Sequence, residues 1–285
     1  MSDLRIALIY FSATYVTKSY AEVIKEGVER RGYKVRLIDV TPYSSRQEYL
    51  PVDDFDGFIF GFPVFADFAP SVINDWIPTL QGKGKRCAMF FTYGGRTTGY
   101  AHFHTKTLLE KAGFLVQFSA EFLGRHSFNV GGWRALPDRP NEEDFDVARE
   151  FAALTVEQFL HASPRTLALQ KPFAYNAVMD FLSHKKKSNE RGLRHPVRST
   201  EECSMCLRCE TECPNKAFNA NSGVSDPLEC IECMHCVYIC PDKVLKVDDR
   251  MQKAYHIFLE NWHLTEQMMN EKRSKIITAA WQAAS

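Results

Sequence analysis

The chain contains CSMCLRCETECP at residues 203–214 and CIECMHCVYICP at residues 230–241. In each stretch four cysteines are separated by two, two and three residues, and a proline follows the last one. A gap of two residues lets a short loop bring successive thiolates around three irons of one iron–sulfur cluster. The repeated pattern therefore predicts two clusters and decides how this part of the chain folds.

A zinc site or a disulfide framework would account for these cysteines less well. A zinc site closes with four ligands, and it leaves unexplained a third thiolate two residues on and a fourth before proline. A disulfide framework is typical of small secreted domains, whereas this chain has 285 residues and no signal-peptide pattern. We therefore expect reduced cysteines that bind iron.

Gap for gap, both stretches resemble the run that holds a cubane [4Fe–4S] cluster in bacterial two-cluster ferredoxins. The resemblance covers about residues 197–249 and implies a small α+β ferredoxin domain there. It also implies that each cluster takes its fourth ligand from the other copy. One cluster would be bound by Cys203, Cys206, Cys209 and Cys240, and the other by Cys230, Cys233, Cys236 and Cys213.

Composition narrows the function classes. Lys plus Arg and Asp plus Glu both number 35, so no overall charge favours nucleic acid or an anionic membrane. Eight of the nine cysteines lie in the twin pattern, and Cys87 is predicted to be a core residue. Clusters held by thiolates favour a reducing, anaerobic cytoplasm. No apolar stretch is long enough to predict a membrane span.

Strands and helices alternate in the N-terminal half of the chain. Apolar runs predict strands at residues 4–11, 33–40, 55–60, 86–91 and 114–122. Helices are predicted after Thr17 and at residues 71–80, 105–112 and 142–160. This alternation predicts an α/β domain at residues 1–163, with a doubly wound, flavodoxin-like parallel sheet of five strands in the order 2-1-3-4-5.

Three stretches follow the carboxyl ends of these strands, where such sheets bind ligands. The first offers hydroxyls and helix N–H groups for a phosphate, and the other two offer glycines and aromatic rings for a flat ring system. They resemble the FMN-binding loops of flavodoxins, which implies FMN as a cofactor. The residues are Ser12, Ala13, Thr14, Tyr15, Val16 and Thr17; Gly61, Phe62, Pro63, Val64 and Phe65; and Thr92, Tyr93, Gly94 and Gly95.

One position departs from the flavodoxin pattern. The family usually has Gly-Asn where this chain has Tyr15-Val16. Glycine adopts a positive φ easily, whereas tyrosine or valine does so at a cost. We therefore expect a different local turn around the phosphate, or a flavodoxin-like domain that holds no flavin.

The loop after the fifth strand is long for a connection between a strand and a helix. Residues 124–134 carry Arg125, His126 and Arg134, which are candidate catalytic residues. These side chains could bind an anionic or carbonyl-bearing acceptor, with His126 as a proton donor. Alternatively, the loop is a surface flap that shields the flavin or packs against the ferredoxin module.

Two further segments complete the predicted organisation. Residues 164–196 are predicted to be a linker, with a helix at residues 167–182 followed by basic residues. Such a charge run is typical of a solvated segment, or it steers an acidic redox partner. Residues 250–285 form the last segment, and a helix is predicted over residues 251–282. The basic residues are Lys185, Lys186, Lys187, Arg191, Arg194 and Arg198.

The whole chain resembles the flavodoxin–ferredoxin fusion proteins. The resemblance implies an electron-transfer protein that relays electrons between two [4Fe–4S] clusters and FMN, and on to a redox partner. That partner would be a ferredoxin, a reductase or a terminal enzyme, and a homodimer is possible. One alternative is an FMN-dependent reductase of a small-molecule acceptor. Another is an electron-transfer subunit of a larger complex.

Overall fold

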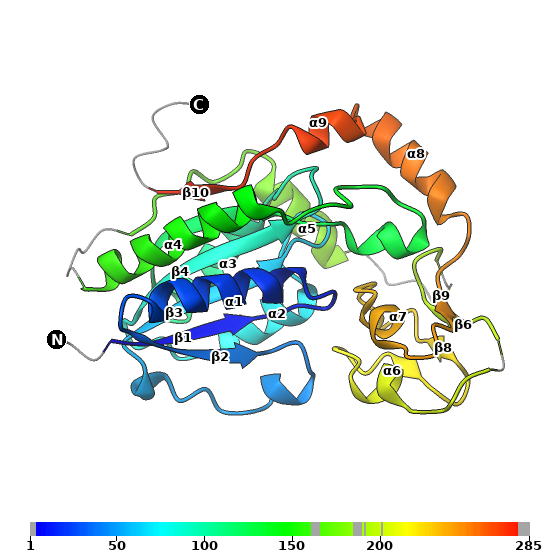
Figure 1. The fold of residues 1–285 in the computed structure, drawn as a ribbon, viewed down its shortest axis with the longest axis horizontal. Helices are drawn as coiled ribbons and strands as arrows, with labels where there is room; N and C mark the ends of the chain where they lie inside the picture. Colours follow the sequence, from blue (N-terminus) through cyan, green and yellow to red (C-terminus); the bar gives the residue numbers. More distant parts are fainter. Residues whose placement is uncertain (1–3, 161–165, 185–189, 191, 201, 279–285) are drawn as a thin grey trace.

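The computed structural model describes residues 4–160, 166–184, 190, 192–200 and 202–278. A six-stranded sheet with the order β10-β5-β4-β3-β1-β2 forms the larger part of the molecule (Figure 1). Strands β1 to β5 are parallel, so the predicted order 2-1-3-4-5 is confirmed. These strands are β1 (Arg5–Tyr10), β2 (Lys34–Asp39), β3 (Gly57–Pro63), β4 (Arg86–Tyr93) and β5 (Leu115–Leu123).

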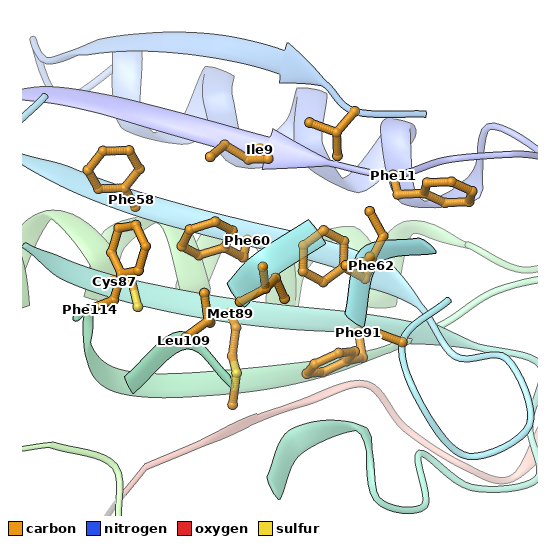
Figure 2. Close-up of a cluster of buried hydrophobic side chains, with 14 of the residues drawn as sticks. Ile9, Phe11, Phe58, Phe60, Phe62, Cys87, Met89, Phe91, Leu109 and Phe114 are labelled. Atoms are coloured by element: carbon orange, nitrogen blue, oxygen red, sulfur yellow. The ribbon is translucent and has the colours of Figure 1, made fainter. Parts of the chain in front are cut away.

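Both faces of the sheet are covered by helices because alternate side chains of its strands are apolar on both sides. One face packs against α1 (Val16–Glu29) and α4 (Glu142–Leu160), which also contact each other. The other packs against α2 (Ser71–Trp76) and α3 (Ala101–Lys111). Figure 2 shows this second core, in which Ile9, Phe58, Phe60, Phe62, Met89 and Phe91 alternate along β1, β3 and β4.

The cysteine-rich region forms a small separate unit. Its four short strands have the order β7-β8-β6-β9, and two short helices lie beside them. Figure 1 shows this unit next to the end of the large sheet to which the β1 and β2 arrows point. The elements are β6 (Val197–Arg198), α6 (Arg208–Thr211), β7 (Phe218–Asn219), β8 (Val224–Ser225), α7 (His235–Ile239) and β9 (Leu245–Lys246).

The single helix predicted over residues 251–282 is wrong. The segment forms α8 (Met251–Asn261), α9 (Glu266–Asn270) and the strand β10 (Lys275–Ile277). His263 takes a positive φ of 49° and ends the first helix, and Thr265 caps the second. Ile276 and Ile277 then pack on opposite faces of the sheet, as a strand requires, and β10 pairs antiparallel with β5.

The linker also differs from the prediction. Its helix, α5, spans Tyr175–His184 rather than residues 167–182. Leu167 is extended, donates its N–H to the Val116 carbonyl at 2.7 Å and packs in the sheet core, so the apolar start of this segment serves the core. Single-turn 3₁₀ helices occur at Ser44–Arg46, Val52–Asp54, Ile77–Thr79 and Ser127–Gly131. Among the described helices, none has the length and apolar character needed to cross a bilayer.

Candidate functional site

A cavity of about 580 Å³ lies at the carboxyl ends of β1, β3 and β4. The predicted phosphate stretch and the loops after β3 and β4 line one side of it. The loop after β5, helix α8, the segment 192–194 and the start of the second cysteine motif line the other side. A cavity of this size is typical of small-molecule sites, and segments distant in sequence form it.

Backbone and hydroxyl hydrogen bonds shape the stretch Ser12–Thr17. Ser12 donates its N–H to Thr41 Oγ1 at 2.7 Å, and its own hydroxyl accepts from Lys18 N–H at 3.0 Å. The Thr17 and Thr92 hydroxyls are hydrogen-bonded at 2.8 Å, which ties the first loop to the loop after β4. The first turn of α1 therefore begins at the cavity, where helix N–H groups favour an anion.

The sequence predicts that Tyr15 forces a turn different from that of flavodoxins, but the residue has a positive φ, a conformation that glycine adopts easily. Tyr15 has φ 66° and ψ −6°, in the left-handed region, directly before α1. Its side chain is 44% exposed and does not line the cavity. A non-glycine residue costs about 1–2 kcal/mol in this conformation, so the loop keeps a shape usual for glycine at the expense of some stability.

The residues predicted to contact the flavin ring divide into two groups. Pro63, Val64 and Phe65 line the cavity, as do Thr92, Tyr93 and Gly94. Gly61, Phe62 and Gly95 do not: the first two lie in β3, and Gly95 packs against Met269 and Leu136. The strand β3 therefore continues to Pro63, beyond its predicted end at residue 60.

His126 enters the cavity, and its environment keeps it neutral. Its Nδ1 accepts the Phe128 N–H at 3.1 Å, so the neutral ring carries its proton on Nε2. The ring lies 4.8 Å from Trp133 and so close to Gly94 that a Cβ at that position would be 2.5 Å away. Burial, helped by Arg194 and Arg96, lowers the pKa of His126 to about 4.

The remaining two catalytic candidates lie in different places. Arg125 lines the cavity with an exposed side chain, whereas Arg134 is exposed and does not line it. Beside them, Trp133 packs on Tyr255 and Phe258 and donates Nε1–H to the Met251 carbonyl at 2.9 Å. The loop after β5 is therefore held against α8 by ring packing and a hydrogen bond.

Several lining residues carry no signal in the local sequence. Arg96 forms an ion pair with Asp67 and lies 4.2 Å from the centre of the Trp262 ring. Arg194, predicted to be in a solvated run, is exposed and also pairs with Glu232 at 2.9 Å on the cavity wall. Only the fold places these side chains together, because no local pattern connects them. Outside the described residues lie Lys185, Lys186, Lys187 and Arg191.

The cysteines line two small cavities in the second unit. One is lined by Cys203, Cys206, Cys209 and Cys240, and the other by Cys213, Cys230, Cys233 and Cys236. Each cavity thus receives three cysteines of one copy and the last cysteine of the other. Among the described residues, no three His, Cys, Asp or Glu side chains are grouped to hold a single metal ion.

The two copies share an unusual backbone. Three non-glycine residues of each copy take a positive φ at matching positions: Met205, Leu207 and Lys216 in the first, and Glu232, Met234 and Lys243 in the second. Each such residue costs about 1–3 kcal/mol and persists only where surrounding structure enforces it. Ala217 also donates its N–H to Cys213 Sγ at 3.2 Å. Both loops are therefore shaped around their cysteines.

The second cysteine cavity lies nearer to the large one. Ile231 and Glu232, between two of its cysteines, line the large cavity, and Cys233 packs in the core beneath the sheet. His235, buried next to Cys236, is hydrogen-bonded through Nδ1 to the Ala13 carbonyl at 2.8 Å. The cysteine unit is thus joined to the phosphate stretch.

Comparisons with known proteins agree with the two-part organisation. Residues 195–241 match the family model described as the 4Fe-4S dicluster domain. No match was found among the curated proteins.

Solved structures resemble the sheet domain. A flavodoxin from the domain Archaea is 17% identical, with 55% of this chain and 100% of that one covered and a TM-score of 0.42. Flavodoxin 2 from Bacillus cereus is 20% identical over 54% and 99%, with a TM-score of 0.43. The flavodiiron core of Flv1 from Synechocystis sp. PCC6803 is 22% identical over 56% and 37%, with a TM-score of 0.44. The strand order makes the sheet flavodoxin-like, and the family match adds a 4Fe-4S dicluster domain at residues 195–241.

Proposed function

We propose that this protein relays electrons between two [4Fe–4S] clusters and FMN, and from there to a redox partner. The observation that carries the proposal is the contact between the sites: the second cysteine cavity borders the large cavity through Ile231, which lines both. Clusters exchange single electrons and FMN accepts one or two, so the pair converts between the two kinds of transfer.

The cysteine cavities support crossed ligation. Cluster I would be bound by Cys203, Cys206, Cys209 and Cys240, and cluster II by Cys230, Cys233, Cys236 and Cys213. The left-handed residues between these cysteines fix the loops, and N–H groups directed at sulfur tune the potential.

The large cavity offers complementary groups for FMN. The Ser12, Thr14 and Thr17 side chains and the start of α1 would bind the phosphate. Pro63–Phe65 and Thr92–Gly94 would contact the ring, and His126 would meet it as a neutral hydrogen-bond donor through Nε2. Arg125 lies beside Gly124, which packs against Val16 at the helix start, so it would add positive charge near the phosphate.

The elements on the other side of the cavity favour a second candidate function. The loop after β5 and α8 line that side, and the Trp133 hydrogen bond to the Met251 carbonyl joins them into a cover. An FMN-dependent reductase of a small acceptor would use such a cover to exclude water. In that case Arg125 and Arg96 would bind an anionic acceptor, whereas a protein partner would receive electrons only through a cluster.

We also propose a division into domains, with a sheet domain at residues 1–163, a linker at 164–196 and a cluster domain at 197–249. We assign residues 250–285 to a final segment, of which the described part returns to the first domain, because α8 lines the proposed FMN cavity and β10 extends the sheet.

Cofactor analysis of anaerobically purified protein tests the proposal. We expect about eight iron and eight sulfide per chain, as two cubanes require, together with FMN. Rapid mixing with a one-electron reductant should reduce the clusters before the flavin. A protein with no flavin after reconstitution, or a flavin that reacts without the clusters, contradicts the relay.

Crossed ligation has its own test. Cys213→Ser should perturb the cluster bound by Cys230, Cys233 and Cys236, because the second cavity contains all four residues. The measurement is the EPR spectrum of the reduced protein, compared with that of Cys240→Ser as the matched variant for cluster I. Cys87→Ser, outside both motifs, is the control. The same spectrum from both motif variants would argue against two distinct sites.

A further inference from the structure

We infer that Arg46 sets the direction of electron flow by raising the reduction potential of cluster II above that of cluster I. The inference rests on the proposed function, since it concerns how the two clusters differ. Arg46 lies in the single-turn helix after β2, far in sequence from the cysteines and outside both copies of their motif.

Arg46 is a buried cation held in a fixed place. Only 8% of the Arg46 surface is exposed to solvent. The Nη1 atom donates to the carbonyls of Val40 and Thr41 at 2.6 and 2.9 Å, and Nη2 donates to the Pro214 carbonyl. Because Pro214 directly follows Cys213, the guanidinium links the sheet domain to a ligand loop of cluster II.

Neighbouring side chains complete this contact between the domains. The Tyr43 ring lies between two cations, with Arg46 Cζ 5.9 Å and Lys216 Nζ 4.1 Å from its centre. A guanidinium stays charged in proteins, so a positive charge lies beside Pro214, directly after the proposed cluster II ligand Cys213.

Cluster I has an acidic residue where cluster II has a neutral one, directly after the Cys-Pro pair of each motif. Pro214-Asn215 in the first motif matches Pro241-Asp242 in the second. Asp242 lines the cluster I cavity and accepts the Ser204 N–H and hydroxyl at 2.8 and 2.7 Å, whereas Asn215 is neutral. A hydrogen-bonded aspartate carboxyl is ordinarily ionised at neutral pH, so a negative charge lies on the lining of the cluster I cavity.

The remaining charges near the clusters are more exposed or paired. Arg208, which lines the cluster I cavity, is exposed and bound to Glu212 at 2.7 Å. Arg198 lines the same cavity but is only half-buried, and it donates to the backbone carbonyls of Ala220 and Asn221 at 3.0 and 3.2 Å. Glu232, beside Cys233, is paired with Arg194. Solvent screens exposed charges much more than a buried one. The buried Arg46 therefore dominates the difference between the two sites.

The difference between the two reduction potentials gives electron transfer a fixed order. A nearby positive charge stabilises the state with one more electron, so cluster II is the better acceptor. Cluster II also borders the FMN cavity, whereas cluster I does not. Electrons that enter at cluster I thus move to cluster II and then to the flavin.

Redox titration of three variants, followed by EPR under anaerobic conditions, tests this inference. Arg46→Gln should lower the higher of the two cluster potentials, changing the equilibrium for electron transfer from cluster I to cluster II at least about tenfold, or 59 mV for one electron. Arg46→Lys keeps the charge and should retain most of the difference. Arg208→Gln, an exposed cation at cluster I, should change the equilibrium less than about threefold.

The outcomes separate the two proposals. Wild-type protein without two clusters overturns the proposed function itself. Fully loaded Arg46→Gln with an unchanged higher potential overturns only the role of Arg46. If Arg46→Gln fails to hold cluster II, the Arg46→Lys variant decides. A potential difference between the clusters equal to that of the wild type supports the charge effect, and a tenfold loss in the transfer equilibrium overturns it.

Discussion

His126 shows how the fold sets the chemistry of one side chain. A histidine in a loop would titrate near its ordinary pKa of 6.5, but burial beside Arg194 and Arg96 lowers this pKa to about 4. The unfolded chain therefore binds a proton at higher pH than the folded one. The stability that depends on neutral His126 is complete above about pH 6.5 and is lost as the pH falls towards 4.

Histidine NMR gives a direct measurement of this shift. We expect His126 to remain neutral, with its proton on Nε2, from pH 8 down to about pH 5. His184, an exposed histidine on α5, is the internal comparison. A titration of His126 near pH 6.5 would show that it is free to act as an imidazolium acid.

Tyr15 is the second residue with a measurable consequence. Its φ of 66° is a conformation that glycine adopts freely. Tyr15→Gly should therefore stabilise the protein by about 1 kcal/mol and leave FMN affinity intact. Tyr15→Ala removes the same ring but keeps the strain, so it should show no such gain in urea unfolding. Equal stability of both variants would mean that the ring, rather than the backbone, matters.

Among the elements, β10 depends on a buried ion cluster on β5. Glu121 accepts from Thr98 Oγ1 at 3.0 Å and lies 3.1 Å from Lys275 on β10 and 3.6 Å from His102. Burial alone would raise the pKa of Glu121, but pairing with His102 and Lys275 lowers it to about 2. Its ionised form thus stabilises the fold above about pH 4.5, and that stabilisation is lost as the pH falls towards 2.

Glu121→Gln should weaken the attachment of β10. At neutral pH we expect a loss of up to about 3 kcal/mol, shrinking as the pH is lowered through 4.5. Hydrogen exchange of residues 275–277 measures it locally. Glu110→Gln, which removes an i,i+4 pair with Lys106 on α3, is the control and should change exchange little. Unchanged protection in Glu121→Gln would assign the attachment to packing.

At the scale of the whole molecule, α8 and the loop after β5 would decide how open the proposed flavin site is. Trp262 lines the cavity and packs on Arg96. Trp262→Ala should increase the access of a soluble quencher to the flavin and speed its reoxidation by small acceptors severalfold. Trp76→Phe is the control, because Trp76 lies in the core on α2 and does not line the cavity. A variant that reacts like wild type would show that acceptors enter elsewhere.

The features that local sequence can predict are those whose residues are neighbours along the chain. The cysteine spacing and the alternation of strands and helices belong to this class, whereas the strand order came from the resemblance to flavodoxins, because other doubly wound orders share the same alternation. The wall formed by Arg96, Arg194 and Trp262 has no such signal, because three separate segments meet only after folding. Ile276 and Ile277 fit a helical pattern for a related reason: a three-residue strand is too short to show a period of two.

The position of β10 also bears on the order of events during synthesis. The ribosome delivers β1–β5 first, then the whole cluster domain, and only then the strand that covers the edge of β5. Until that moment the β5 edge has unpaired backbone groups open to other chains. Completion of the sheet therefore waits for the cysteine loops to emerge. A nascent chain that stalls before residue 275 would present an uncapped edge, whatever the state of its iron.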